Sequence, residues 1–553
     1  MTRWTKLAIT CAILCFAVPA AVASSITFKV TLPASQKEPI TGRVFIIIAR
    51  AGDPEPRLQV GSWRSRTELI AADVPGLAPG QTLSLDVLTL GFPLKSVREL
   101  PAGDYYVQAL FNIYTRFQRA DGHTIFAHLD QWEGQQFNKS PGNLYSEVGH
   151  FHLDPLTGYE IRLSLDHKIP TPLPPGDTAY VKHIKIQSKL LTQFWGQPIY
   201  LGATVLLPEG YDAHPKAHYP VLYEQGHFNL QAPLGFATEQ PGNAPPPGEG
   251  RISGVELYQR WTAAGFPRMI AVRFQHPTIY FDDSYAVNSA NNGPYGDAIM
   301  TELIPYIEEH FRTIRQPYAR VLSGGSTGGW ESLALQVFHP DFFGGTWTFY
   351  PDPVDFSRYQ LVDIYNDNNA FLAPNFDPPI PERPLMRSVE GQTEITIRQM
   401  SQLEEVLGSH GRSGQQLEAW EAVYGPVGVD GYPKPLWDKV SGKIDQSVAL
   451  YMRDHGYDLR YYLQQNWATL GPQLAGKIHI YCGDMDNFYL NLAVYKLEDF
   501  LRSANPAFGG SFEYGRPMKG HGWSPLNQAE LVRTIANHIA LNAPAGADNS
   551  WKY

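Results

Sequence analysis

Hydrophobic and polar positions follow two different patterns along the chain. Residues 24–168 contain short strand-like segments, in which apolar and polar residues alternate or β-branched residues run together. These segments are 26–32, 42–49, 105–113 and 160–165. Turns rich in Gly, Pro and Asp separate them, which is typical of a β-sandwich. From residue 177 to about 545, strand-like and helix-like segments alternate, as a parallel sheet with crossover helices requires. The pattern therefore predicts an all-β N-terminal domain followed by an α/β domain.

Proline-rich segments predict two further divisions of the chain. Residues 169–176 read Ile-Pro-Thr-Pro-Leu-Pro-Pro-Gly and predict a stiff linker between the two domains. Residues 350–476 mix Pro-rich and helix-like pieces and are much longer than a simple crossover. Because long loops over a sheet edge often shape binding pockets, we expect this insertion to form a pocket wall or a lid.

The first 23 residues predict a secretory signal peptide. Arg3 and Lys6 precede an apolar run over 7–18, and Ala21-Val-Ala23 is a typical small-residue cleavage site. The run is short for a membrane span, so we expect export to a periplasm or the medium, with a tethered N-terminus as the alternative. Cys482 is the one cysteine outside this segment, so the mature chain is not expected to form an internal disulfide.

Composition narrows the class of partner. The 553 residues are 43% hydrophobic, which suffices for the cores of more than one domain. The formal net charge is −10, and charged residues make up 18% of the chain in short mixed runs. An acidic chain without a basic cluster is not expected to bind nucleic acid.

The most informative motif is Gly324-Gly325-Ser326-Thr327-Gly328. It lies between a strand-like segment and a helix-like one, where a tight turn can hold a serine clear of its neighbours. A serine needs that exposure, and a base, to become a nucleophile. The Thr327 amide would lie at the helix N-terminus, where free N–H groups and the helix dipole favour an oxyanion. We therefore expect Ser326 to be the nucleophile and Thr327 an oxyanion-hole residue.

Candidate partners of this serine follow later in the chain. His521 lies between two glycines after the strand-like segment 512–518, where a base can reach the serine and shuttle its proton. Asp484 and Asp486 both follow the strand-like segment 477–482, and either can orient the histidine. Asp484 can alternatively cap the turn or the next helix.

These residues resemble the esterase D-like group of α/β-hydrolases, which includes S-formylglutathione hydrolases and feruloyl and enterobactin esterases, with mycolyltransferases as acyl-transferring relatives. The matching pieces are Tyr219-Pro-Val-Leu-Tyr223, Tyr295-Gly-Asp-Ala-Ile299, Glu302 to Ile307, Phe311-Arg312, the serine turn Gly324–Gly328 (the nucleophile elbow of this fold), Gly483-x-x-Asp486 and Gly520-His521. The resemblance implies a doubly wound, mostly parallel sheet, with Ser326 as nucleophile, Asp486 as acid and His521 as base. One departure is that the family's His-Gly pair is reversed here, as Gly226-His227. The Phe228 amide is our first candidate for the second oxyanion donor, and that of His227 the second.

The sequence thus predicts a secreted serine hydrolase that cleaves a small-molecule or polymer-linked carboxylic ester through an acyl-enzyme. No metal or organic cofactor is expected. His150 and His152 lie on one strand face, but no third ligand is apparent nearby. A serine peptidase and an acyltransferase on the same fold are the alternatives, and a catalytically dead binding protein is a third.

Overall fold

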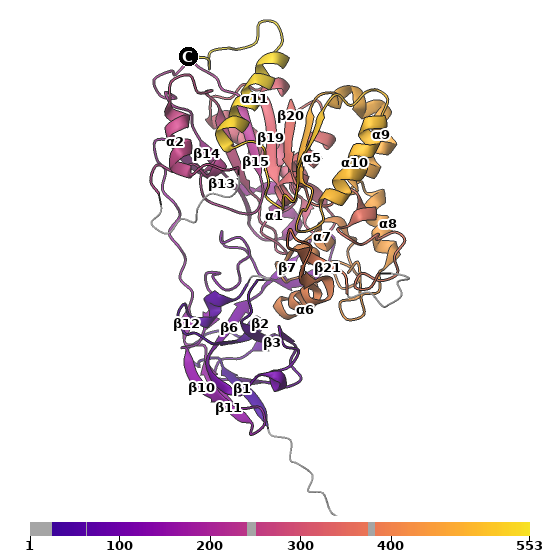
Figure 1. The fold of residues 1–553 in the computed structure, drawn as a ribbon. Helices are drawn as coiled ribbons and strands as arrows, with labels where there is room; N and C mark the ends of the chain where they lie inside the picture. Colours follow the sequence, from indigo (N-terminus) through magenta and orange to yellow (C-terminus); the bar gives the residue numbers. More distant parts are fainter. Residues whose placement is uncertain (1–24, 62–63, 241–249, 374–381) are drawn as a thin grey trace, which may run out of the picture.

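The computed structural model describes residues 25–61, 64–240, 250–373 and 382–553 (Figure 1). The predicted signal peptide lies outside the described residues. No helix in the described part of the chain is long and apolar enough to cross a membrane.

Residues 25–168 form two packed β-sheets. The smaller sheet has the order β11 (Tyr159–Ser164), β1 (Ile26–Thr31), β4 (Thr82–Asp86). The larger has the order β12 (His167–Lys168), β9 (Leu144–Tyr145), β6 (Gly103–Ile113), β2 (Ile40–Ala49), β3 (Glu68–Leu77), β5 (Gly91–Phe92), with β10 (Gly149–Leu153) also paired to β6. A hairpin of β7 (Thr115–Gln118) and β8 (Thr124–Ala127) and the short helices η1 (Pro56–Gln59) and η2 (Val97–Glu99) complete this region.

Strand β2 is buried on both of its faces. Val44 and Ile46 point into the core between the two β-sheets, together with Phe28 and Phe111. Phe45, from the opposite face, belongs to the core of the rest of the molecule. A strand covered on both sides reads as a continuous apolar run, which explains Val-Phe-Ile-Ile-Ile in the sequence.

After an exposed segment without regular structure over 170–178, the chain enters a sheet of eight strands. Its order is β13 (Val181–Ser188), β14 (Ile199–Leu206), β16 (Ile270–Gln275), β15 (Val221–Gln225), β19 (Arg320–Gly325), β20 (Gly345–Phe349), β23 (Ile478–Gly483), β24 (Ser511–Gly515). All neighbours from β16 to β24 are parallel, whereas β13 and β14 pair antiparallel. The mostly parallel sheet agrees with the α/β prediction and brings the carboxyl ends of β15, β19, β20 and β23 to one edge.

Two groups of helices cover this sheet. Helix α2 (Gly254–Thr262) packs with α11 (Gln528–Asn542), whereas α5 (Thr327–Phe338) and α10 (Asn491–Ser503) pack with α9 (Leu459–Leu474). Figure 1 shows α2 and α9 on opposite sides of the strands. The remaining elements are α1 (Lys189–Trp195), η3 (Pro233–Gly235), β17 (Asn288–Ser289), β18 (Gly293–Pro294), α3 (Tyr295–Ala298), the π-helical η4 (Ile299–Leu303), α4 (Ile304–His310) and η5 (Pro317–Ala319).

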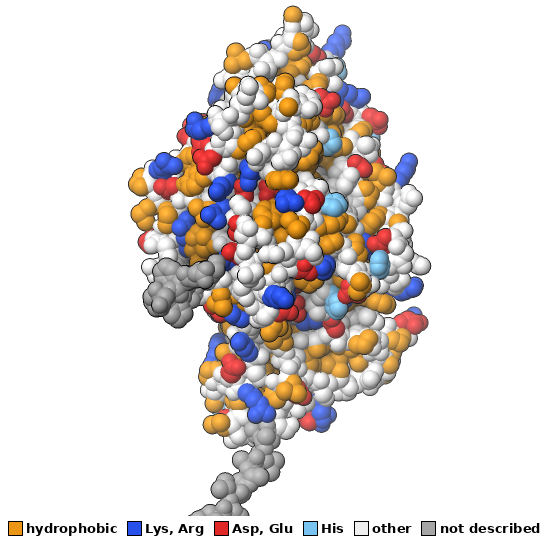
Figure 2. Space-filling view, turned by 90° about the vertical axis from the view of Figure 1, so that its right-hand side faces the viewer, with side chains coloured by type: hydrophobic (Ala, Val, Ile, Leu, Met, Phe, Trp, Pro, Cys, Tyr) orange, Lys and Arg blue, Asp and Glu red, His pale blue; other side chains and the backbone are white. Residues whose placement is uncertain are grey.

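The segment between β20 and β23 connects the two parts of the molecule. It contains η6 (Phe356–Arg358), β21 (Pro384–Arg387), β22 (Thr393–Thr396), α6 (Ile397–Leu407), α7 (Gln416–Tyr424), α8 (Gln446–Asp454) and α9. Helix α6 packs against β3 and β5 of the N-terminal region. Arg43 Nε donates to the Val406 carbonyl at 3.0 Å, and Arg412 Nη2 lies 2.7 Å from Asp73 Oδ2. On the face drawn in Figure 2, basic and acidic side chains are intermixed.

Candidate active site

Ser326 lies on a strained turn between β19 and α5. Its backbone has φ 59° and ψ −123°, a conformation that a residue with a side chain rarely adopts. The turn can be this tight because the flanking glycines have no side chains. A Cβ on Gly324 would lie 2.1 Å from the Gly328 carbonyl oxygen, and a Cβ on Gly328 would lie 2.2 Å from the Gln225 carbonyl oxygen. The sequence therefore makes this elbow locally, from small residues around one serine.

His521 and Asp486 form a hydrogen-bonded pair. The His521 Nδ1 atom lies 2.8 Å from Asp486 Oδ2, and the Asp486 side chain is fully buried. The other carboxylate oxygen accepts hydrogen bonds from the Phe488 and Leu490 amides at 2.9 and 3.2 Å. The imidazole is also held edge-on by the rings of Tyr350 and Phe488. The two residues come from the loops after β24 and β23, so neighbouring strand ends bring them together.

Asp484 has a different set of contacts. Its Oδ1 atom accepts a hydrogen bond from the Lys519 amide at 3.1 Å. Asn487 contacts the same loop, because its Oδ1 accepts from the His521 amide at 2.8 Å. Both side chains thus hold the backbone that carries His521, while Asp486 contacts the imidazole itself.

Ser326 and His521 line one cavity of about 790 Å³. In the structure the Ser326 hydroxyl donates not to the imidazole but to Asp352 Oδ1, over a long 3.4 Å. Hydrogen bonds between a nucleophile and its base are often long or absent without substrate, so this geometry is compatible with a serine that turns to the histidine during reaction.

Asp352 is a site residue that the sequence analysis missed. It is 3% exposed, follows β20, and lines the cavity beside Ser326. Burial raises the pKa of its carboxyl group, while hydrogen bonds from Tyr285 and Thr327 act in the opposite direction. The sequence held one signal: Tyr-Pro-Asp-Pro follows the strand next to the elbow strand, and parallel strands end at the same edge.

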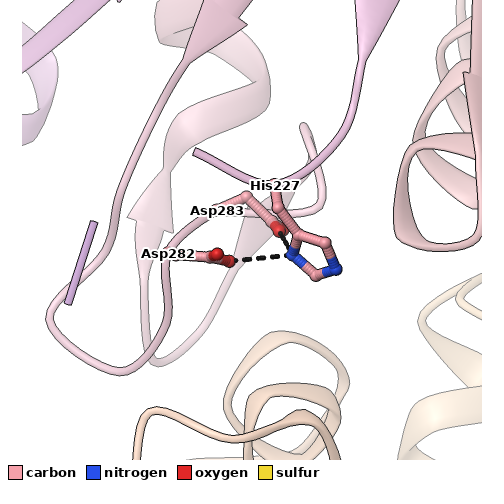
Figure 3. A group of neighbouring side chains, drawn as sticks. All are labelled: His227, Asp282 and Asp283. Carbon is pink, nitrogen blue, oxygen red and sulfur yellow. Dashed lines mark hydrogen bonds and ion pairs between the residues drawn. The ribbon is translucent and has the colours of Figure 1, made fainter. Parts of the chain in front are cut away.

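His227 also lines this cavity, next to two acids (Figure 3). Its Nδ1 atom lies 3.0 Å from Asp282 Oδ1 and 3.1 Å from Asp283 Oδ2, and the ring is 48% exposed. Although burial works against the charged ring, these two carboxylates raise the pKa of His227 well above its usual range. Among the described residues these three could offer ligand atoms to a metal ion, all within 4.8 Å of one another. The hydrogen bonds from His227 Nδ1 to Asp282 and Asp283 already give these three ligand atoms partners without an ion.

The two predicted oxyanion-hole residues lie in different surroundings. Thr327 is fully buried at the start of α5, and its hydroxyl donates to Asp352 Oδ2 at 3.0 Å. The Phe228 ring packs edge-on against Trp132, with ring centroids 5.3 Å apart, and is not among the residues that line the cavity. Gly226, just before His227, has φ 150°, a value that favours glycine.

His150 and His152 are not among the residues that line this cavity, and they have separate partners. His152 Nδ1 lies 2.9 Å from Asp104 Oδ1, and both side chains are 66% exposed. His150 stacks on Tyr106. Each ring is thus accounted for by a neighbour on the larger N-terminal sheet.

Three segments distant in sequence complete the cavity wall. The N-terminal region contributes residues around Leu58 and Gly134, and the segment after β20 contributes Met400, Gln416 and Trp420. Ser326, Asp486 and His521 follow strands of the eight-stranded sheet, whereas most of the other residues that line the cavity lie outside that sheet.

The strand order and the serine elbow define the class of the protein, an α/β-hydrolase. Residues 200–354 match the model of the family described as "Putative esterase". This match confirms the resemblance to an esterase-like branch of the α/β-hydrolases that the motifs indicate, and it supports carboxylic-ester hydrolase activity.

Solved structures of esterases also resemble this chain, at low identity. A "ferulic acid esterase" shares 16% identity, with 65% of this chain and 99% of the other covered and a TM-score of 0.34. An S-formylglutathione hydrolase from Agrobacterium tumefaciens shares 13% (66% and 96% covered, TM-score 0.32), and a CE1 ferulic acid esterase from Anaeromyces mucronatus 14% (67% and 95%, TM-score 0.30). Scores this low carry no argument about activity. No curated protein sequence matches the chain significantly.

Proposed function

We propose that the chain is an exported serine esterase that cleaves carboxylic esters through an acyl-enzyme intermediate, with Ser326 as nucleophile, His521 as base and Asp486 as the orienting acid. The observation that carries the proposal is the strained Ser326 elbow facing the same cavity as the hydrogen-bonded His521–Asp486 pair. Export rests on the sequence of the first 23 residues alone.

The proposed reaction begins with a rotation of the Ser326 side chain from Asp352 toward the imidazole. Because Nδ1 of His521 donates to Asp486, Nε2 is the unprotonated nitrogen that can accept the serine proton. The serine oxygen attacks the ester carbonyl, and the imidazolium returns the proton to the leaving alcohol. A water molecule, activated by the same nitrogen, then releases the acid and restores the serine. Each step uses this chain's own side chains.

Two backbone amides are the proposed donors to the oxyanion. The first is that of Thr327, which occupies the first position of α5. The second comes from the segment after β15, where Gly328 approaches Gln225 so closely that a side chain would collide. Phe228 is the first candidate there by sequence, but the position of His227 on the cavity favours the His227 amide.

The architecture we propose around this site has an all-β domain over 24–168, a linker over 169–176, and a catalytic domain over 177–545 with an insertion at about 350–476. The N-terminal domain is proposed to shape the substrate pocket, because residues around Leu58 and Gly134 line the cavity.

The test is hydrolysis of p-nitrophenyl esters of graded acyl length by the wild type and by Ser326→Ala. We expect the variant to lose at least about 10⁴-fold in kcat/KM, since nothing else in the site replaces an activated nucleophile. Ser323→Ala is the matched control. Ser323 is buried on β19, just before the turn that carries Ser326, and its hydroxyl donates to the Trp347 carbonyl and does not line the cavity. A fluorophosphonate probe should label the wild type and the control but not Ser326→Ala.

Three results would contradict parts of this proposal. Equal activity in Ser326→Ala would exclude this serine as nucleophile. No hydrolysis and no labelling of the wild type would favour a binding protein. Labelling without ester hydrolysis would point to acyl transfer or to a peptide substrate.

A further inference from the structure

We propose that Asp352 is a specificity-determining residue, and that it selects esters carrying a hydroxyl or ammonium group close to the scissile bond. The inference rests on the proposed serine esterase function and names a substrate class for that site. It is carried by the unequal surroundings of the two Asp352 oxygens.

One oxygen of Asp352 is saturated by the protein. Oδ2 accepts hydrogen bonds from Tyr285 OH at 2.6 Å and Thr327 Oγ1 at 3.0 Å. Gln416 Nε2 and Trp420 Nε1 lie 3.2 and 3.3 Å from the same oxygen, and both lie closer to the Tyr285 hydroxyl, which they hold against Asp352. These donors come from the loop after β16, from the elbow helix and from α7, so three separate elements hold the carboxylate in one orientation. These bonds favour the charged form of the carboxylate and oppose the effect of burial, which raises its pKa.

The other oxygen faces the nucleophile. Ser326 Oγ, at 3.4 Å, is the hydrogen-bond partner of Oδ1 in the described part of the chain. Catalysis requires the serine to leave this oxygen for His521. Because Asp352 is 3% exposed, Oδ1 would then lose its partner from the protein, at the wall of the cavity beside Ser326.

A substrate donor resolves this conflict. An unpaired buried acceptor is costly, whereas a hydrogen bond between a carboxylate and a hydroxyl or ammonium group is among the stronger ones in proteins. Because Oδ1 lies within hydrogen-bond reach of the nucleophile, it can meet a donor only a few atoms from the ester carbonyl. Such a substrate both binds Asp352 and frees Ser326, so we expect it to have a higher kcat and a lower KM than a substrate without the donor.

The same geometry predicts which substrates are excluded. A substrate with its own carboxylate at that position would place a second negative charge against Asp352, which is unfavourable. A plain aliphatic ester would leave Oδ1 unpaired. The expected order of preference is therefore hydroxyl or ammonium, then alkyl, then carboxylate.

The experiment compares esters of matched size by titrating the released acid. On the acyl side, methyl 3-hydroxypropanoate and methyl 3-aminopropanoate are compared with methyl butanoate and monomethyl succinate. On the alcohol side, 2-hydroxyethyl butanoate is compared with propyl butanoate. We expect the wild type to prefer the donor-bearing ester by about tenfold or more in kcat/KM on one of the two sides, the scale of a charge-assisted hydrogen bond.

The variant Asp352→Asn tests the residue itself. Because four donors converge on the Oδ2 position, the amide oxygen of the asparagine should occupy it and turn the NH₂ group toward Ser326. The preference for donors should then fall to within about threefold, and the relative rate on monomethyl succinate should rise. Asp282→Asn, an acid on the same cavity with no hydrogen bond to Ser326, should keep the wild-type ratio between the neutral matched esters, hydroxyl against alkyl.

The outcomes separate cleanly. A wild type that hydrolyses all the esters without preference would overturn the inference and leave the esterase proposal standing, and this holds even if Asp352→Asn fails to fold. A preference that survives in a folded Asp352→Asn would assign the selectivity to another residue. A wild type that hydrolyses none of these esters and none of the p-nitrophenyl esters would overturn the proposed function and this inference with it, whereas cleavage of p-nitrophenyl esters alone would overturn only this inference.

Discussion

The two sides of the active-site cavity are built in different ways. On one side, Ser326, Asp486 and His521 follow the ends of three strands in one parallel sheet, and each is held by contacts within its own loop or the neighbouring one. On the other side, residues around Leu58, Gly134 and Gln416 meet although long stretches of sequence separate them. In the proposed function the sheet therefore supplies the chemistry, while the N-terminal region and the segment after β20 supply most of the surface that a substrate would meet.

Replacing Asp486 or Asp484 is the sharpest test of the side of the cavity that carries Ser326 and His521. Asp486→Asn should lower kcat by about 10²–10⁴-fold, because the imidazole loses the carboxylate that sets its tautomer and stabilises its charged form. Asp484→Asn should cost less than about tenfold, since that side chain contacts the Lys519 amide and not the ring. Single-turnover kinetics of both variants make the comparison. A larger loss in Asp484→Asn would reverse the assignment of the acid.

The side of the cavity formed by the N-terminal region can be changed by a substitution at Gly134. This residue has φ +72°, and a Cβ there would lie 2.7 Å from the Phe228 ring, so Gly134→Ala must displace that ring or the backbone. We expect about 1–3 kcal/mol of lost stability and a raised KM with a smaller change in kcat. Thermal unfolding and steady-state kinetics provide the two measurements.

Gly122→Ala is the matched control for this change. Gly122 also has a positive φ, of +92°, but no atom lies within 4 Å of the position that a Cβ would take, so only the backbone cost of about 1 kcal/mol is expected. If both variants behave alike, the contact between Gly134 and Phe228 does not position the wall.

A smaller and pH-dependent effect is expected in α7, the helix that carries Gln416 and Trp420. Burial raises the pKa of Glu418 to about 7, with Lys439 opposing the shift and Glu421 adding to it. Because the folded state holds this proton more tightly than the unfolded chain, the stability contributed by Glu418 is present below about pH 4.5 and is lost as the pH rises through 7.

Glu418→Gln should therefore be more stable than the wild type at pH 8, by about 1–3 kcal/mol at most, with the difference closing toward pH 5. Urea unfolding at several pH values measures this. Glu421→Gln serves for comparison: Glu421 Oε2 lies 2.8 Å from Lys439 Nζ in a buried pair, so its loss should destabilise the protein at both pH values. A pH-independent gain in Glu418→Gln would contradict the burial argument.

Several features of the site were predictable because they are local. Gly324 and Gly328 permit a tight turn in which any side chain at their positions would collide with the backbone, and the serine lies at the apex of that turn. Asp486 and Asp484, in contrast, lie about equally close to a strand end in the sequence. Their different contacts depend on how the loop carrying His521 folds back over the end of β23, which no short pattern encodes.

Asp352 was not predicted because its importance comes from its neighbours. In sequence it is one acid between two prolines. In the structure its Oδ2 atom receives donors from residues 285, 327, 416 and 420, which lie on three distant elements. Similarly, β2 has the sequence of one strand of a sandwich, but Phe45 on its second face packs into the core shared with the α/β sheet.

The sequence by itself determined the alternation of strands and helices and the serine turn, which follow from hydrophobic periodicity and short-range sterics, whereas the order serine, acid, histidine was implied by the family resemblance. Only the tertiary structure decided which acid contacts His521, that Asp352 lies beside Ser326, and that the N-terminal region lines the cavity. These depend on contacts between segments far apart in the chain, which form only when the apolar faces of the β-sheets and the helices are buried together.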